Sequence, residues 1–208
     1  MTTIVVMAKE PRAGRVKTRL CPPCTPAAAA AIAAAALADT LHAVAQSSCS
    51  ARMLALDGTP GAWIPPGFIV MPQVDGDLGE RLGAAADAVR GPVLVVGMDT
   101  PQLTPELLDD ACARLLHPST GAVLGPATDG GYWCIGFRHH VGRRAAFHDV
   151  PMSRAVTGER QHQRLVELGF RVELLRPLRD VDTIDDAYAV AHEIPRSRFA
   201  GTLARIAA

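Results

Sequence analysis

The most restrictive feature of the sequence is residues 92–98, Pro-Val-Leu-Val-Val-Gly-Met, an apolar run between two segments with helical patterning. A strand that is apolar on both faces needs cover on both, which is typical of the centre of a parallel sheet flanked by helices. The run ends at Asp99, and Thr104-Pro105 then supplies the cap and first-turn proline of a helix ending near Leu116. We therefore predict an α/β fold with Asp99 at the carboxyl end of a central strand.

The start of the chain predicts a second buried strand at residues 4–7, which ends in a loop because Pro11 and Gly14 follow it. Gly14 lets the main chain approach an anion, and the loop contains five cationic side chains: Lys9, Arg12, Arg15, Lys17 and Arg19. Such a loop suits a polyphosphate, although a solvated basic turn is the alternative. The spacing fits neither a Walker loop nor the Gly-x-Gly-x-x-Gly dinucleotide fingerprint.

The rest of the sequence predicts strands that alternate with helices. Strands are expected at 51–56, 68–71, 121–125, 134–137 and 170–175, and helices at 27–46, 80–90, 153–168 and 184–193, before a helical C-terminal tail. The turn at residues 73–82 joins a strand to a helix, which is the ligand-facing arrangement in open α/β sheets. Alternatively, Gly76 and Gly79 only end the strand and admit the helix.

Two later turns contain acidic residues. Asp129-Gly130-Gly131-Tyr132 predicts either a plain hairpin turn or the lining of a small-molecule pocket. Asp180 and Asp182 are two residues apart, so both point to the same side of an extended segment. Asp182 or the next residue could cap the following helix, whereas the pair could instead form the second arm of a cation site.

Composition excludes several classes of function. The 208 residues are enough for one sizeable core, and Lys plus Arg equal Asp plus Glu at 21 each, so no overall basic field attracts nucleic acid. Aromatic residues make up only 4%, which argues against a stacking platform for single strands. We expect no apolar run of the roughly 20 residues that span a bilayer, and no signal peptide. The sequence thus predicts a cytoplasmic protein.

The five cysteines do not indicate a disulfide framework, because their number is odd. Cys21-Pro-Pro-Cys24 has redox or half-zinc-site spacing but no second pair to complete a site. Incidental thiols are therefore favoured over a metal or redox function.

Five motifs in register resemble the GT-A-like nucleotide-binding transferases, a bacterial family of incompletely characterised function. They are Lys9-x-Pro-x-x-Gly-x-x-Lys-Thr-Arg-Leu20, Gly76-Asp-Leu-Gly-x-Arg81, Gly97-x-Asp-x-Pro101, Gly125-Pro-Ala-x-Asp-Gly-Gly-Tyr132 and Asp180-Val-Asp-Thr183. The resemblance covers residues 3 to about 190 and extends more loosely to 2-phospho-lactate guanylyltransferase and the molybdenum cofactor nucleotidyltransferases. It implies a single-domain, Rossmann-like GT-A fold over residues 1–208, in three α/β/α layers around a mostly parallel mixed sheet.

The resemblance also assigns roles to residues. It implies a divalent cation, Mg²⁺ or Mn²⁺, held by Asp99 and Asp182. The residues expected to act in catalysis are Lys17, Arg19, Asp99 and Asp129. Those expected to bind the nucleotide are Lys9, Arg12, Gly14, Arg15, Lys17, Thr18, Arg19, Gln73, Gly79 and Arg81. Those expected to face an acceptor are Gly130, Gly131 and Tyr132.

Three functions are compatible with these motifs. The first is nucleotidyl transfer to a phosphorylated small molecule or sugar phosphate, with release of pyrophosphate. The second is glycosyl transfer from a nucleotide sugar, and the third is nucleotide binding without turnover. In each case the partners are a nucleotide and, for the enzymes, a small acceptor, with no nucleic acid and no membrane span.

Overall fold

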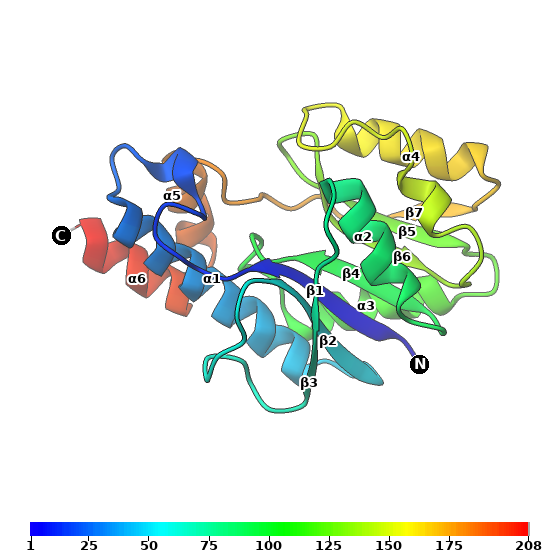
Figure 1. Cartoon of the computed structure of the whole chain (residues 1–208), viewed down its shortest axis with the longest axis horizontal. Helices are drawn as coiled ribbons and strands as arrows, with labels where there is room; N and C mark the ends of the chain where they lie inside the picture. Colours follow the sequence, from blue (N-terminus) through cyan, green and yellow to red (C-terminus); the bar gives the residue numbers. More distant parts are fainter. Residues whose placement is uncertain (208) are drawn as a thin grey trace.

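A seven-stranded mixed sheet forms the centre of the protein, and the computed structural model describes residues 1–207 (Figure 1). The strand order is β3-β2-β1-β4-β6-β5-β7. Neighbouring strands are parallel except at β6, which runs antiparallel to both β4 and β5. The strands are β1 (Thr3–Lys9), β2 (Ala51–Asp57), β3 (Phe68–Pro72), β4 (Val93–Gly97), β5 (Ala122–Pro126), β6 (Tyr132–Phe137) and β7 (Val172–Leu174).

Helices cover both faces of this sheet (Figure 1). The helices are α1 (Pro26–Gln46), α2 (Leu78–Asp87), α3 (Pro105–Leu116), α4 (Thr157–Glu167), α5 (Ile184–Glu193) and α6 (Arg198–Ala207), with 3₁₀ turns η1 (Thr18–Leu20) and η2 (Arg144–Phe147). Helices α1 and α3 pack on one face, whereas α2, η2 and α4 pack on the other. Helices α5 and α6 pack against α1. The predicted three-layer GT-A-like architecture with a mostly parallel sheet is confirmed.

Alternate residues of the central strands face opposite layers, which explains their continuous apolar sequence. In β1, Ile4 and Val6 pack towards α1, while Val5 and Met7 pack towards α2. In β4, Leu94 and Val96 share a cluster with α1 and α3, and Val93 and Val95 lie in the cluster on the opposite face. The prediction of a central strand within residues 92–98 is therefore correct, but the strand is parallel only to β1 and runs antiparallel to β6 on its other side.

Helix α1 corrects one sequence prediction, that no apolar run approaches the length of a membrane span. By length and composition it could cross a membrane, with a mean hydropathy of 1.6 over its best window. In this fold 61% of that window is buried. The helix packs alanines and Leu37 and Leu41 closely onto the sheet, so its apolar character is used in the core.

Several predicted boundaries also shift. Strand β6 starts earlier than predicted, at Tyr132, and β7 is only three residues long. Helix α4 starts at Thr157 instead of 153, because Ser153 has a positive φ of 57° that a helix cannot contain. Residues 153–156 therefore form a loop, which becomes part of the cavity described below.

The sheet topology brings the polar turns to one edge. The carboxyl ends of the parallel strands and the amino end of β6 meet there, because β6 runs in the opposite direction. Chain order reverses at β1, which has β2 on one side and β4 on the other. Loops diverge at such a switch point and leave a crevice between them.

Candidate active site

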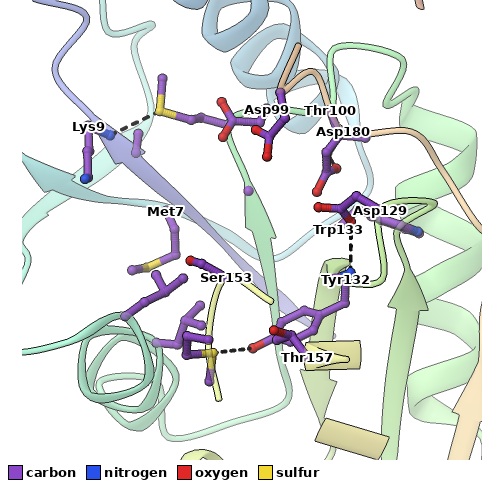
Figure 2. Close-up of a pocket in the computed structure, with 18 of the residues that line it drawn as sticks. Met7, Lys9, Asp99, Thr100, Asp129, Tyr132, Trp133, Ser153, Thr157 and Asp180 are labelled. Carbon is purple, nitrogen blue, oxygen red and sulfur yellow. Dashed lines mark hydrogen bonds between the residues drawn. The ribbon is translucent and has the colours of Figure 1, made fainter. Parts of the chain in front are cut away.

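A cavity of about 930 Å³ opens at this edge of the sheet. Its lining comes from the loop after β1, the ends of β2 and β4, the start of β6, the 152–157 loop and the acidic turn before α5. Its size is within the range of pockets that hold small molecules and cofactors. Figure 2 shows Asp99 and Asp180 on one side of this space and Tyr132 and Thr157 on another, with Asp129 between Asp180 and Tyr132.

Lys17 joins the two predicted metal ligands. Its Nζ lies 3.0 Å from an oxygen of Asp99, just after β4, and 3.2 Å from an oxygen of Asp182, just before α5. The Lys17 side chain is only 7% exposed, whereas those of Asp99 and Asp182 are 39% and 33% exposed. The ammonium thus lies beneath two carboxylates that face the cavity.

Local structure fixes this lysine. Val16 and Leu20 are buried on either side of it and anchor the loop in the core. Lys17 itself has a left-handed backbone, with φ 49°, immediately before the 3₁₀ turn η1. Burial lowers the pKa of Lys17, but the negative charges of Asp99 and Asp182 outweigh burial and raise the pKa overall. Lys17 is therefore a charged ammonium in the folded protein.

The acidic turn is attached to the end of β4 by further bonds. The Val181 N–H donates to the Asp99 carbonyl at 3.0 Å, and the Thr100 hydroxyl donates to Asp180 at 2.9 Å. Arg19 donates to the second oxygen of Asp182, also at 3.0 Å. These contacts hold both carboxylates of the turn on the cavity side, as the two-residue spacing predicts.

Among the acidic residues at the site, Asp180 has the carboxyl whose pKa is raised most. Burial raises its pKa to about 7, and the charges of Asp99 and Asp129 add to the increase. The hydrogen bond from Thr100 and the charge of Lys17 act in the opposite direction. Shifts of this kind are common at functional sites, where burial and neighbouring like charges are brought together.

Gln73 and Arg81 line the end of the cavity next to β2. The Gln73 side-chain amide donates to the carbonyls of Ala8 and Ala55, both at 2.9 Å, which leaves its oxygen directed towards Arg81 at 3.4 Å. Arg81 also pairs with Asp57 at 2.9 Å. Gln73 and Arg81 therefore line the cavity in fixed orientations.

The predicted acceptor turn forms the opposite wall. Asp129 accepts a hydrogen bond from the Gly131 N–H at 2.8 Å, and both residues line the cavity with Tyr132. The Tyr132 hydroxyl donates to Gln161 at 3.3 Å, and burial raises the pKa of this phenol. Gly130 lies outside the lining: a Cβ there would come within 1.9 Å of the Ala155 carbonyl, so this glycine allows two loops to touch.

The first loop divides into residues that line the cavity and residues that do not. Lys9, Arg15, Lys17, Thr18 and Arg19 line it. In contrast, Arg12 pairs with Glu10 at 2.8 Å and is half exposed, and Gly14 is exposed with a φ of 77°.

Gly79 also lies outside the cavity lining. It is buried in the first turn of α2, where a Cβ would lie 3.3 Å from Met152 and from the Phe147 carbonyl. Its position supports the alternative in which this glycine only admits the helix.

Asp99 and Asp182 are suited to a hard divalent cation. Mg²⁺ and Mn²⁺ prefer oxygen ligands, and Mg²⁺ is typically bound by one or two carboxylates together with substrate phosphates and water. Both carboxylates already surround a cation, the ammonium of Lys17. Within residues 1–207, no group of three or more His, Cys, Asp or Glu side chains forms a complete metal site. Asp99 and Asp182 would therefore need oxygens from a bound ligand or water to complete the coordination of a divalent cation.

Sequence reasoning missed several polar lining residues, among them Asp57, Thr100, Ser153, Arg154 and Thr157. Asp57 is the last residue of β2 and Thr100 comes shortly after β4, so their positions at the carboxyl edge gave a usable signal. The 153–157 loop gave none, because its residues continue the polar pattern of α4.

The two cysteines of Cys21-Pro-Pro-Cys24 lie outside the cavity. Both are free and partly buried against the cluster formed by α1, α5 and α6. Burial raises the pKa of Cys24, which makes its thiol less reactive.

Comparison with known structures supports this architecture. A protein of Desulfovibrio desulfuricans, provisionally named a nucleotide-diphospho-sugar transferase, superimposes with a TM-score of 0.89 and 26% identity over 98% of this chain and 94% of that one. Protein Rv0371c of Mycobacterium tuberculosis in complex with manganese gives a TM-score of 0.53 and 22% identity over 92% and 97%. A CMP:2-keto-3-deoxy-manno-octonic acid synthetase complexed with CTP gives 0.60 and 12% over 94% and 98%.

Family assignment comes from the sequence itself. No curated protein matches the chain, but residues 28–154 match a family described as an uncharacterised protein conserved in bacteria, DUF2064. The predicted family resemblance, the GT-A-like fold and the transferase class are confirmed by these findings. Because the match spans more than half of its residues, the chain belongs to the bacterial family DUF2064.

Proposed function

We propose that the protein is a metal-dependent nucleotidyltransferase that acts on a phosphorylated small molecule. The observation that carries this proposal is the convergence of Asp99, Asp182 and Lys17 at one point beneath a basic loop. This point lies at the carboxyl edge of the sheet, beside the switch between β1 and β4. A cytoplasmic location and Mg²⁺ or Mn²⁺ as the cation are part of the proposal.

In this reaction an acceptor phosphate oxygen attacks the α-phosphorus of a nucleoside triphosphate. A new P–O bond forms, the bond between the α-phosphorus and its bridging oxygen breaks, and pyrophosphate leaves with both electrons of that bond. Such chemistry needs alignment and charge neutralisation more than covalent participation by the protein. A cation held by Asp99 and Asp182 supplies neutralisation of the phosphates when bound.

The charges on the cavity walls support these roles. Lys9, at the end of β1, and Arg15, in the loop after it, line the cavity, and neither has an ion-pair partner in the part of the chain that the structure describes. Both are therefore available to the nucleotide phosphates, together with Arg19. Gln73 and Arg81 border the end of the cavity that we assign to the base.

The acceptor wall contains Asp129, Gly131 and Tyr132, and beside them lies Arg154. Arg154 is exposed to the cavity and forms no ion pair with any residue in 1–207. An unpaired guanidinium is suited to a phosphate or carboxylate. We therefore assign Arg154 to the anionic group of the acceptor.

Glycosyl transfer from a nucleotide sugar is the second candidate, because the relative from D. desulfuricans bears that name. In that reaction Asp129 would act as the base towards an acceptor hydroxyl. The density of cations in the first loop favours a triphosphate over a diphosphate donor.

The two reactions are separated by their products. We expect pyrophosphate to be released when the protein is incubated with a panel of nucleoside triphosphates, phosphorylated sugars and Mg²⁺. Release of a nucleoside diphosphate from a nucleotide sugar would instead support glycosyl transfer. Stabilisation by nucleotides without either product, and without dependence on metal, would indicate a binding module.

Variants test the site assignment. Asp99→Asn and Lys17→Ala should each lower turnover on the order of 10²-fold. Asp99→Asn removes a carboxylate that would hold the cation, and Lys17→Ala removes a positive charge that would stabilise the phosphates in the transition state. Asp185→Asn is the matched control, since Asp185 is exposed and lies outside the cavity lining. Normal turnover in Lys17→Ala would contradict the assignment.

A further inference from the structure

Lys17 occupies the position between the two carboxylates that are suited to a divalent cation. The same Nζ contacts Asp99 and Asp182, and both contacts are 3.2 Å or shorter. The lysine is almost fully buried, so this ion pair is not one of the loose surface pairs whose partners exchange freely with water. A cation coordinated by both carboxylates and the bridging ammonium cannot occupy this point together.

The structure provides somewhere for the ammonium to go. Lys17 itself lines the cavity, and its stem of four methylenes is flexible. The neighbouring side chains of Thr18 and Arg19 are exposed, so the turn around Lys17 is not enclosed on that side.

We propose that Lys17 and the divalent cation exchange on Asp99 and Asp182. In the free protein the lysine pairs with both carboxylates. When a metal–polyphosphate complex binds, Asp99 and Asp182 would coordinate its cation. The released ammonium of Lys17 would then pair with the phosphates. The identity of the polyphosphate as a nucleotide rests on the proposed function, but the exchange itself does not.

Charge balance explains why the cation should arrive with phosphates. A bare cation that displaced Lys17 would break both of its ion pairs and leave its ammonium in the cavity without an anionic partner, which is unfavourable. Phosphate oxygens give the displaced ammonium new partners and also add ligands to a pair of carboxylates that alone is incomplete. Metal and polyphosphate should therefore each strengthen the binding of the other.

The test measures binding of Mn²⁺ alone, without nucleotide, by electron paramagnetic resonance of the free ion. We expect Lys17→Met to bind Mn²⁺ at least about tenfold more tightly than the natural protein, because the competing ammonium is gone. The double variant Lys17→Met/Asp99→Asn should lose this gain. Lys9→Met is the matched control, because Lys9 lines the cavity but contacts neither carboxylate.

Unchanged or weaker Mn²⁺ binding in Lys17→Met would overturn the exchange, and so would an equal gain in Lys9→Met, which would reflect net charge alone. Thermal unfolding checks that the variants are folded, and Lys17→Gln serves as a second variant if Lys17→Met is not. A failure to detect pyrophosphate release would count against the proposed function but would leave this Mn²⁺ comparison intact. Equal Mn²⁺ affinities would reject the exchange while the pyrophosphate assay stood.

Discussion

At the scale of single residues, Asp180 shows how burial sets the properties of the site. Its carboxyl accepts a hydrogen bond from Thr100, but it is partly buried and close to the negative charges of Asp99 and Asp129. The folded protein therefore holds the Asp180 proton up to a pKa of about 7, whereas the unfolded chain releases it near 3.8. Between these values the folded state binds the additional proton.

This difference predicts how stability depends on pH. Because the folded state binds more protons than the unfolded state, the contribution of Asp180 to stability falls as pH rises from about 4 to about 7. Asp180→Asn should remove this decline and stabilise the protein at pH 8 by about 1–2 kcal/mol, less than the full shift implies because the charge is partly screened. Urea unfolding at pH 5 and pH 8 measures the effect. Asp185→Asn, at an exposed carboxylate, should leave the pH dependence unchanged.

At the scale of elements, two loops meet at the cavity wall that contains Asp129 and Gly131. Gly130 has a φ of 90°, and its carbonyl accepts a hydrogen bond at 2.7 Å from the Gly158 N–H at the start of α4. A Cβ at Gly130 would overlap the Ala155 backbone. The turn after β5 and the 153–157 loop can therefore lie in contact only because residue 130 has no side chain.

Gly130→Ala should therefore destabilise the protein by about 3 kcal/mol or more, because it combines backbone strain with a clash against rigid main chain. The matched control is Gly169→Ala, at a similar φ of 81° but with open space around the added carbon. This control should cost only about 1–2 kcal/mol of backbone strain. If both variants unfold at the same urea concentration, the loop contact is not important for stability.

At the scale of the whole molecule, the C-terminal helices pack behind the acidic turn that contains Asp180 and Asp182. Phe199 of α6 is fully buried in a cluster with Ile32 and Ala36 of α1. The same cluster contains Val181, which lies between the two acids of the turn. Packing remote from the cavity therefore fixes the segment that carries Asp180 and Asp182.

Phe199→Ala should lower the free energy of unfolding by about 3–5 kcal/mol, the usual cost of an aromatic cavity in a core. Chemical denaturation monitored by circular dichroism measures it. Leu116→Ala, at a leucine that is 37% exposed at the end of α3, should cost less than about 1–2 kcal/mol. Similar costs for the two variants would show that α6 is not an integral part of the core.

Most of the fold was predictable from sequence because its signals are local. The apolar run at 92–98, the capped helix after it and the order of strands and helices depend on burial and on residues close in the chain. The positions of Asp99, Asp129 and Asp182 at the carboxyl edge followed from the same pattern, because parallel strands end on the same side of a sheet.

The pairing within the site was decided only by tertiary structure. Lys17 and Asp182 are 165 residues apart, and nothing in either local sequence indicates that one neutralises the other. The outward direction of Arg12 and the entry of Arg154 into the cavity wall likewise depend on how distant loops pack. Sequence by itself determined which charges reach this edge of the sheet, since that is set by local pattern and strand direction. Which charges touch was set by the fold, because contact depends on strand order and on packing between remote segments.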